Sequence, residues 1–302
     1  MNRREYINAM TALGIISVIP SWAITQSQSI MKRIIPATGE KLPAVGVGTW
    51  QTFDVGESDR ERIPLKAVLQ QLVKQNGSVI DSSPMYGRSE RVVGDLSTEL
   101  GINDKLFLAT KVWTSGREAG INQMKTSMSL MKRDKIDLMQ IHNLVDWQTH
   151  YKTLRQWRDE GKIRYIGITH YVDSAHDQIE RIIKNNPVDF IQINYSIVNR
   201  YAETGVLNIA QEKGVATLIN QPFGGGGLFG KVRGKEIPQW AKEFGCESWG
   251  CFFLKYILAN PAVTCVIPGT SKLQHMIDNL SAGVGGLPND TQRKQMIDLV
   301  EG

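Results

Sequence analysis

Residues 79–87 read Val-Ile-Asp-Ser-Ser-Pro-Met-Tyr-Gly, an apolar run that ends in a carboxylate and continues into a Ser/Pro turn. This order predicts a strand with Asp81 at its carboxyl end and a loop that carries Tyr86. Two later apolar runs, Leu106 to Lys111 and Ile136 to His142, also end in an ionisable residue. Because the carboxyl ends of parallel strands meet at one rim, these side chains should lie together, as catalytic residues do in (β/α)8 barrels.

The rest of the chain alternates between strand and helix patterns, which predicts an α/β fold of the (β/α)8 TIM barrel class. An N-terminal β-hairpin is expected over residues 32–45. Strands are predicted at 45–50, 79–81, 106–111, 136–142, 164–169, 190–195, 215–220 and 263–267. Helices are predicted at 59–75, from 89, after 117, up to 161, at 249–258 and, as the last barrel helix, after 270. Met124, Met128 and Met131 have helical spacing and are expected in the core.

Composition limits the possible functions. The chain has 302 residues, 41% of them hydrophobic, which suits one large core. The formal net charge of +5 comes from scattered basic residues, which argues against nucleic-acid binding. Cys246, Cys251 and Cys265 lack a metal-binding spacing and are expected to be buried, inert thiols. We expect a monomer whose partner is a small molecule.

Residues 1–31 are predicted to be an export signal and linker, and residues 32–302 the barrel. Arg3-Arg4 precede an apolar run at 9–19 that is too short to span a membrane comfortably, and Ser21 and Ala23 suggest a cleavage site. The paired arginines resemble a twin-arginine signal, which predicts a periplasmic protein with no stable membrane span after the signal is removed. An uncleaved helix, a membrane anchor and a cytoplasmic location remain alternatives.

If Asp81, Tyr86, Lys111 and His142 converge, they suit proton transfer to a carbonyl oxygen. A tyrosine hydroxyl is a poor acid at neutral pH unless a neighbour such as an ammonium stabilises its anion, and a carboxylate can hold that ammonium. A histidine can donate to the substrate oxygen and orient it. The set does not suit nucleophilic acyl transfer or metal binding, because no serine or cysteine lies beside a base at a strand end and two of the four residues are Lys and Tyr.

Each of the four residues also has a structural alternative. Asp81 could cap the next turn, Lys111 could be a solvated strand end, and Tyr86 and His142 could be packed side chains without a chemical role. That all four occur at the proper strand ends, in order, favours the catalytic interpretation.

Over residues 32–285 the sequence resembles the aldo-keto reductase superfamily. The matching segments are Val47-Gly48-Thr49-Trp50, residues 81–87, Thr110-Lys111-Val112-Trp113, Gln140-Ile141-His142, residues 161–167 and Ile267-Pro268-Gly269-Thr270. The resemblance implies NADPH-dependent reduction of an aldehyde or ketone to an alcohol. It makes Tyr86 the general acid, Lys111 the modulator of its pKa, Asp81 the partner of the lysine and His142 the residue that orients the carbonyl. It also implies substrate contacts from Trp50, Trp113 and Asn143.

The resemblance implies an NADPH site too, with NADH not excluded. The nicotinamide side would involve Gly48, Thr49, Thr169, His170 and Gln192, where Thr169-His170 replaces the usual Ser-Asn pair. Asn220 replaces a tyrosine that commonly stacks on the nicotinamide, so the stacking face is either missing or supplied by Phe223 or Tyr195.

The remaining cofactor residues implied by the resemblance belong to two segments. The backbone of Pro222, Phe223 and the glycines from Gly224 to Gly227 would approach the pyrophosphate. The adenosine end would meet Gly269, Thr270, Ser271, Lys272, His275, Asp278 and Asn279. His275 replaces the usual arginine, which weakens the expected preference for NADP over NAD.

Two other functions fit the same residues. A redox-sensing or scaffolding barrel could bind the nucleotide with little turnover, as the unusual Asn220 and His170 suggest. An isomerase or lyase could use Tyr86 as a base and would not require nicotinamide.

Overall fold

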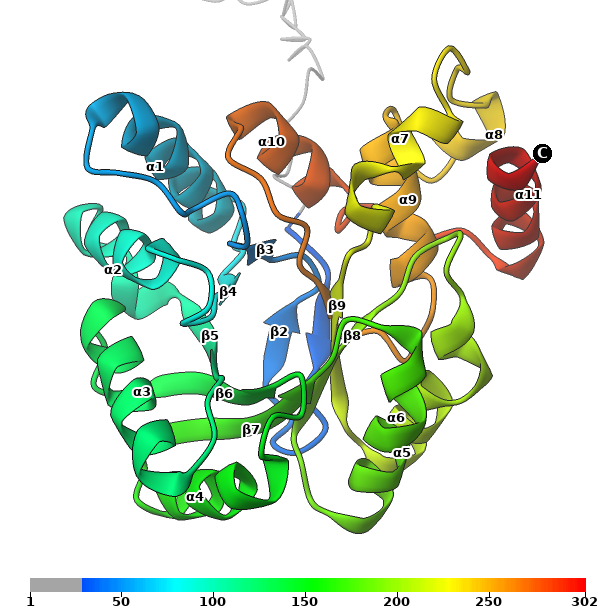
Figure 1. The fold of residues 1–302 in the computed structure, drawn as a ribbon. Helices are drawn as coiled ribbons and strands as arrows, with labels where there is room; N and C mark the ends of the chain where they lie inside the picture. The colour runs from blue at the N-terminus through cyan, green and yellow to red at the C-terminus, as the bar shows by residue number, and fades with distance from the viewer. Residues whose placement is uncertain (1–28) are drawn as a thin grey trace, which may run out of the picture.

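The computed structural model describes residues 29–302, so the predicted export signal and its cleavage site lie outside the described residues. An eight-stranded parallel sheet forms the centre of the molecule (Figure 1). Its strands are β3 (Val47–Gly48), β4 (Val79–Asp81), β5 (Phe107–Val112), β6 (Ile136–His142), β7 (Ile163–Thr169), β8 (Phe190–Asn194), β9 (Ala216–Asn220) and β10 (Cys265–Val266).

The sheet closes on itself. Its strands pair in sequence order, and parallel bridges from Val45 to Val266 and from Gly48 to Gly269 join the segments that contain β3 and β10. A helix follows each strand, and together these helices surround the sheet (Figure 1). These helices are α1 (Asp59–Lys74), α2 (Ser89–Glu99), α3 (Arg117–Leu130), α4 (Trp147–Asp159), α5 (His176–Asn185), α6 (Val206–Lys213), α9 (Trp249–Leu258) and α10 (Leu273–Ser281). The predicted (β/α)8 barrel is confirmed.

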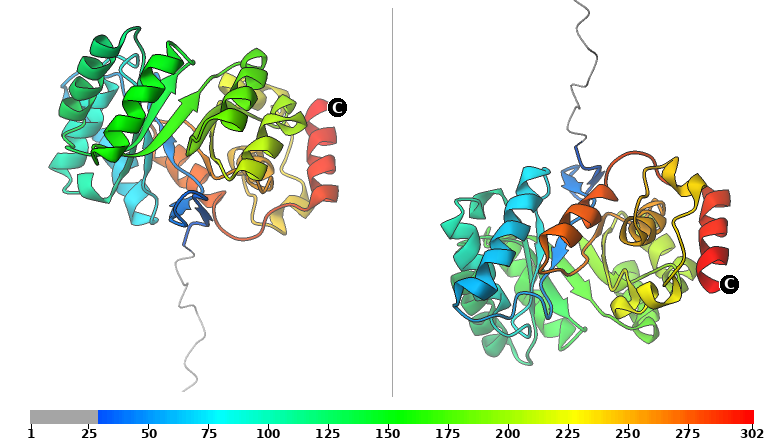
Figure 2. Two further views of the ribbon diagram at one scale, coloured as in Figure 1. Left: turned by 90° about the horizontal axis from the view of Figure 1, so that it is seen from below. Right: turned by 90° about the horizontal axis from the view of Figure 1, so that it is seen from above.

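The predicted N-terminal hairpin is also confirmed. Strands β1 (Lys32–Ile34) and β2 (Lys41–Pro43) pair antiparallel. Ile35 and Leu42 pack against the apolar side chains inside the barrel, and the Tyr165 hydroxyl donates to a carboxylate oxygen of Glu40 at 2.6 Å. The hairpin therefore closes the N-terminal end of the barrel, beside the end of α10, where the Met31 N–H donates to the Gly283 carbonyl at 2.7 Å (Figure 2).

Strand alternation separates two cores. Along β5, Leu108 and Val112 belong to the outer core under the helices, whereas Phe107 and Ala109 belong to the inner core against the hairpin. Lys111 follows Ala109 by two residues and therefore shares the inner face. The same spacing applies to β4, β6, β7, β8 and β9, so along these strands the inner face changes from apolar at the hairpin end to polar at the carboxyl end. The polar inner residues are Asp81, Lys111, Gln140, His142, Thr169, Gln192 and Asn220.

Two barrel helices, α5 and α6, and three further helices lie where no helix was predicted. Short helices α7 (Leu228–Lys231) and α8 (Gln239–Lys242) lie between β9 and α9, and α11 (Asp290–Glu301) forms the edge of the molecule opposite α1 and α2 (Figure 2). An Arg293 Nη2 atom of α11 donates to Glu203 at 2.6 Å and to the Tyr195 hydroxyl at 2.9 Å. This pairing fixes α11 on the connection between β8 and α6.

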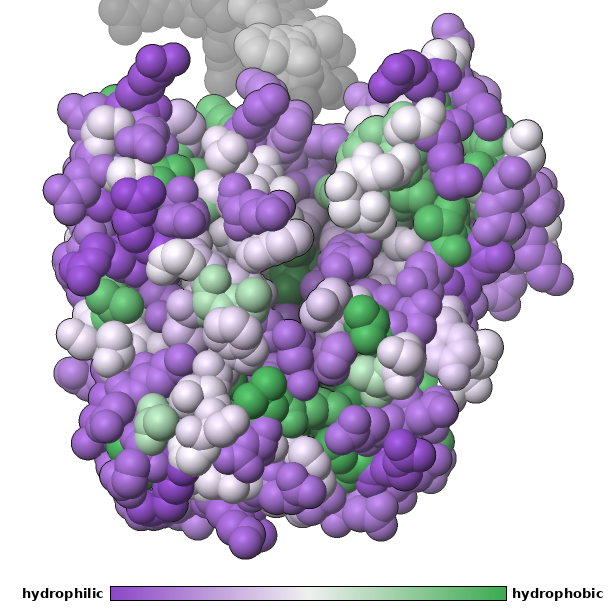
Figure 3. Space-filling view, in the orientation of Figure 1, coloured by the Kyte–Doolittle hydropathy of each residue, from purple (hydrophilic) through white to green (hydrophobic). Residues whose placement is uncertain are grey.

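The surface is largely hydrophilic on the face drawn in Figure 3, which is hollowed near its centre and carries apolar side chains over α7 and α9. Within residues 29–302, no helix combines the length and hydropathy needed to cross a membrane. The three cysteines are buried thiols, as predicted, and the sulfurs of Cys246 and Cys251 lie 3.5 Å apart.

Candidate active site

A buried ion pair lies at the carboxyl end of the barrel. Lys111 Nζ donates to Asp81 Oδ2 at 2.7 Å and to the Ser82 carbonyl at 2.6 Å, and both side chains are buried. Burial alone lowers the pKa of Lys111, but the Asp81 carboxylate and then Tyr86 raise it above its ordinary value. Lys111 is therefore a fixed positive charge, and the predicted pairing of Asp81 with Lys111 is present.

Tyr86 lies over this charge. The turn after β4 places its ring centre 4.9 Å from Lys111 Nζ, so the charge faces the phenol. Burial raises the pKa of Tyr86, and the positive charge of Lys111 lowers it by less, so the net pKa lies above the ordinary value of 10.0. Electrostatic reasoning from the sequence considered only the ammonium. In the structure desolvation is the larger effect, and Tyr86 is held as a protonated phenol.

His142 completes the convergence of the four predicted residues. Its ring meets the Tyr86 ring edge-on at 5.8 Å between centres and lies 6.2 Å from the Trp113 ring. Burial, followed by the charges of Lys111 and His170, lowers the pKa of His142 to about 3. The imidazole is therefore neutral at physiological pH.

Sequence reasoning missed two polar partners of this group. Ser83 Oγ lies 2.9 Å from His142 Nδ1, and Gln140 Nε2 donates to Asp81 Oδ1 at 2.9 Å. Strand alternation places Gln140 on the same face as His142, two residues later in β6, but it does not reach Ser83, which lies in the turn after β4.

Of the predicted substrate residues, Trp113 lies beside His142 and Asn143 follows it in the chain. Trp50 and Trp113 are large apolar side chains that remain 51% and 41% exposed, which is unusual for tryptophan. Asn143 follows β6 with a left-handed φ of 52° and has a buried Oδ1 atom without a hydrogen-bond partner among the described residues.

Thr169 and Gln192 lie at the ends of neighbouring strands, β7 and β8. The Thr169 hydroxyl donates to Gln192 Oε1 at 3.2 Å, which orients the amide and leaves Gln192 Nε2 buried without a partner. Such an unpaired donor is costly unless a ligand accepts from it. One ring nitrogen of His170 is already hydrogen-bonded within the protein. Its Nδ1 atom accepts from the Tyr171 and Val172 N–H groups at 3.0 and 3.4 Å.

Asn220 ends β9, and its buried Oδ1 atom also lacks a partner among the described residues. Of the two aromatic residues considered for stacking near it, Tyr195 is excluded. It follows the end of β8 and packs in the outer core, where its hydroxyl bonds to Glu203 and its ring centre lies 6.2 Å from that of Tyr256. Phe223 packs 5.1 Å from Phe229 at the start of the glycine-rich loop.

The glycine-rich loop leaves its backbone accessible. Gly224, Gly225 and Gly226 have φ values of 56°, 65° and 93°, which side chains disfavour, and a Cβ on Gly225 or Gly226 would meet nothing within 4 Å. Pro222 is buried beneath the loop. Backbone N–H groups in this conformation can approach an anion.

Gly48, Thr49 and Gly269 form the seam of the barrel. A Cβ on Gly48 would lie 2.8 Å from the Ile267 carbonyl, so glycine allows the strands to meet. The Thr49 hydroxyl donates to the Asp81 carbonyl at 3.1 Å and to Ser82 Oγ at 2.9 Å. The contacts of these three residues therefore join neighbouring strand segments of the barrel.

The predicted adenosine residues lie on and before α10, and within the described residues no side-chain hydrogen bond joins them to the four convergent residues. The Lys272 N–H donates to Thr270 Oγ1 at 3.1 Å, and Ser271 lies between them. Lys272 and His275 are exposed, whereas Asn279 is buried. Asp278 accepts a hydrogen bond from Ser248 Oγ, the N-cap of α9.

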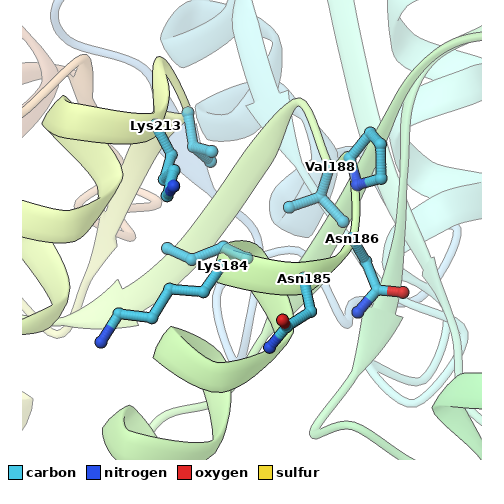
Figure 4. A pocket seen from close by; sticks show the side chains of 8 residues that line it. Lys184, Asn185, Asn186, Val188 and Lys213 are labelled. Carbon is cyan, nitrogen blue, oxygen red and sulfur yellow. The ribbon is translucent and has the colours of Figure 1, made fainter.

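A shallow hollow of about 260 Å³ lies at the opposite end of the barrel (Figure 4). It is lined by the end of α5, the segment before β8 and the end of α6, including Lys184 and Lys213. Both lysines are paired, with Glu180 at 3.5 Å and Glu212 at 4.0 Å. The hollow is remote from the strand ends that carry the four convergent residues.

Known proteins resemble this chain along most of its length. It is 29% identical to aldo-keto reductase YhdN of Bacillus subtilis over 66% of this chain and 63% of that protein. It is 26% identical to methylglyoxal reductase YeaE of Escherichia coli, covering 83% and 89% of the two chains. The fold matches an aldo/keto reductase of Klebsiella pneumoniae solved with NADP and acetate, at a TM-score of 0.76 and 21% identity over 90% of this chain and 96% of that one.

The profile of the Aldo/keto reductase family matches residues 44–296, which span the barrel and most of α11. This chain belongs to the aldo-keto reductase family of oxidoreductases.

Proposed function

We propose that this protein reduces an aldehyde or ketone to an alcohol with NADPH as the reductant. The observation that carries the proposal is the buried Lys111–Asp81 pair, with 2.7 Å between Nζ and Oδ2, directly below a protonated Tyr86 and beside a neutral His142. This group can deliver a proton to an oxygen atom and hold the charge that remains. The names of YeaE and of the Klebsiella structure, which mention methylglyoxal reduction and NADP, support the same class of reaction.

The unpaired polar atoms of the site fit NADPH. Gln192 Nε2 and Asn220 Oδ1 have the donor and acceptor chemistry of a carboxamide partner, and their burial without a partner is otherwise unfavourable. The open backbone of Gly224 to Gly227 fits a pyrophosphate. Thr270, Ser271 and Lys272 precede the first turn of α10, where backbone N–H groups and an ammonium favour a phosphate.

When bound, NADPH supplies a hydride to the carbonyl carbon. The residues of this chain donate the proton and orient the substrate. Tyr86 donates its hydroxyl proton to the carbonyl oxygen, and Lys111 stabilises the phenolate that remains. Asp81 keeps the ammonium charged and in place, and Gln140 restrains the other carboxylate oxygen. Trp50 and Trp113 cover the apolar part of the substrate and limit the access of water.

Turnover tests the proposal against a scaffold that binds nucleotide without chemistry. The purified protein is incubated with NADPH and a panel of small aldehydes that includes methylglyoxal, and loss of NADPH absorbance is followed while NADPH binding is titrated by fluorescence. We expect consumption of NADPH that depends on both protein and aldehyde. Tight NADPH binding without consumption for any aldehyde would favour the scaffold, and turnover of a carbonyl substrate without nicotinamide would favour an isomerase or lyase.

A further inference from the structure

His142 is neutral, so its ring carries one proton on either Nδ1 or Nε2, and the choice decides what the residue offers a substrate. Nε2 has no hydrogen-bond partner among the described residues and is not enclosed like the buried unpaired atoms of the site. A proton on Nε2 gives a donor that can point to a carbonyl oxygen. A proton on Nδ1 leaves a lone pair on Nε2, which repels that oxygen.

Ser83 contacts the other nitrogen. Its Oγ atom lies 2.9 Å from His142 Nδ1 and accepts the Met85 N–H at 3.3 Å. These are the hydrogen bonds of this hydroxyl within residues 29–302, and the side chain is fully buried. The Met85 N–H occupies one lone pair of the oxygen, so the hydroxyl proton remains available for His142.

The two tautomers differ in whether this hydroxyl proton has an acceptor. If Ser83 donates to Nδ1, every polar group in the chain from Met85 to His142 is satisfied. If Nδ1–H donates to Ser83 instead, the serine proton is buried without an acceptor, which is unfavourable by more than an ordinary hydrogen bond contributes. The first arrangement is therefore favoured, and it requires the imidazole proton on Nε2.

We propose that Ser83 is a positioning residue that holds His142 in the tautomer protonated on Nε2, so that an N–H donor faces the carbonyl oxygen of the substrate. The inference rests on the proposed function for its consequence in catalysis, but the tautomer itself can be measured without any substrate. The substrate class that benefits is one with a carbonyl oxygen able to accept two hydrogen bonds, from Tyr86 and His142.

The test is nitrogen NMR of protein labelled with ¹⁵N at its five histidines, with the His142 signals assigned by their loss in His142→Gln. The shifts distinguish a protonated from an unprotonated ring nitrogen. We expect the wild-type protein to have a protonated Nε2 and an unprotonated Nδ1 at neutral pH. A proton on Nδ1 in the wild-type protein would overturn the proposal, whatever the variants do.

Three variants connect the tautomer to catalysis. Ser83→Ala should shift His142 toward a mixture of tautomers and lower kcat about tenfold, the factor that corresponds to one lost hydrogen bond, with NADPH binding unchanged. Ser83→Thr keeps the hydroxyl and should restore the tautomer and a large part of kcat. Ser97→Ala removes another fully buried hydroxyl, in α2, which accepts from Asn103 Nδ2 at 2.7 Å. This variant should change neither the His142 tautomer nor kcat.

The outcomes separate the two proposals. An unchanged His142 spectrum and an unchanged kcat in Ser83→Ala would reject the positioning role while leaving carbonyl reduction intact. If the wild-type protein reduces no carbonyl, the proposed function fails, and the wild-type spectrum still decides the tautomer. Equal losses of kcat in Ser83→Ala and Ser97→Ala would assign the effect to packing and overturn the positioning role.

Discussion

At the scale of single residues, burial and charge act on Tyr86 in opposite directions, and burial is larger. A phenol with a raised pKa keeps its proton until a more basic oxygen is present. The alkoxide oxygen formed in carbonyl reduction is such a base. The Lys111 ammonium is then most important after the transfer, when the phenolate has formed beside it. The same buried site therefore keeps the acid loaded before the reaction and stabilises its conjugate base afterwards.

His142 gives a pH dependence of stability. Its pKa is about 3 in the folded protein against 6.5 ordinarily, so below pH 6.5 the unfolded chain takes up a proton that the folded protein does not. Stability should therefore fall as pH falls from 6.5 toward 3, by about 2.5 kcal/mol from this residue between pH 7 and pH 4.5. Urea unfolding of the wild-type protein and His142→Gln at both pH values measures it. We expect a smaller loss in the variant, and identical losses would contradict the assignment.

Strand alternation explains which site residues could be predicted. Asp81, Lys111 and His142 are ionisable residues at the ends of apolar runs, so their types and positions suffice. Ser83 and Gln140 are small or neutral, and their importance depends on partners that only the fold brings near. Tyr195 lies three residues after Gln192, so strand alternation puts it on the outer face, where it is buried in the outer core.

At the scale of secondary-structure elements, α10 combines a helix N-terminus with the exposed Lys272. If this end holds the 2′-phosphate, Lys272→Ala should weaken NADPH binding about fivefold to tenfold and leave NADH binding nearly unchanged, because only NADPH carries that phosphate. Fluorescence titration with both nucleotides measures the effect. Lys125→Ala, an exposed lysine of α3, serves as the control. Equal weakening of both nucleotides would reject the phosphate site.

Close packing of α2 on α3 depends on Gly94. A Cβ at this position would lie 2.0 Å from the Leu130 carbonyl oxygen and 2.9 Å from Met131 backbone atoms. Gly94→Ala should lower the free energy of unfolding by about 3 kcal/mol, despite the better helix propensity of alanine. Gly230→Ala in α7, where a Cβ would meet nothing within 4 Å, should change it by less than about 0.5 kcal/mol. Denaturant unfolding compares the two, and similar values would contradict the packing argument.

The element boundaries show what periodicity can and cannot predict. Helices α1 and α9 match their predicted spans closely because their apolar positions repeat over more than two turns. Strand β10 contains only Cys265 and Val266 instead of 263–267, because this segment pairs with the β3 segment only through isolated bridges at Val266 and Gly269. Helix α11 was missed, although Asn289 and Gln292 form a capping box that marks its start.

At the scale of the whole molecule, the interior of the barrel differs between its two ends. Polar side chains line the carboxyl end. The hairpin closes the other end with apolar contacts from Ile35 and Leu42. This division follows from the sequence, because the strands from β4 to β9 carry apolar residues at the start of their inner face and polar residues at its end. The arrangement of the loop at Gly224 to Gly227 could not be predicted in the same way, because a glycine-rich segment has no periodicity.

The location of the protein remains a prediction from residues 1–31. We propose export by the twin-arginine route, which would suit a barrel that folds around its cofactor first. Replacing Arg3-Arg4 by Lys-Lys keeps the charge and should retain the precursor in the cytoplasm, as fractionation and immunoblotting would show. Unchanged export of the variant would exclude this route.

The most direct measurement of the central claim is a comparison of wild-type protein and Tyr86→Phe in NADPH-dependent aldehyde reduction and in NADPH binding. The phenol oxygen is the proposed proton donor, so its removal should lower kcat at least a hundredfold while the Kd for NADPH stays within about twofold of the wild-type value. A Tyr86→Phe variant that reduces the aldehyde at the wild-type rate would contradict the account.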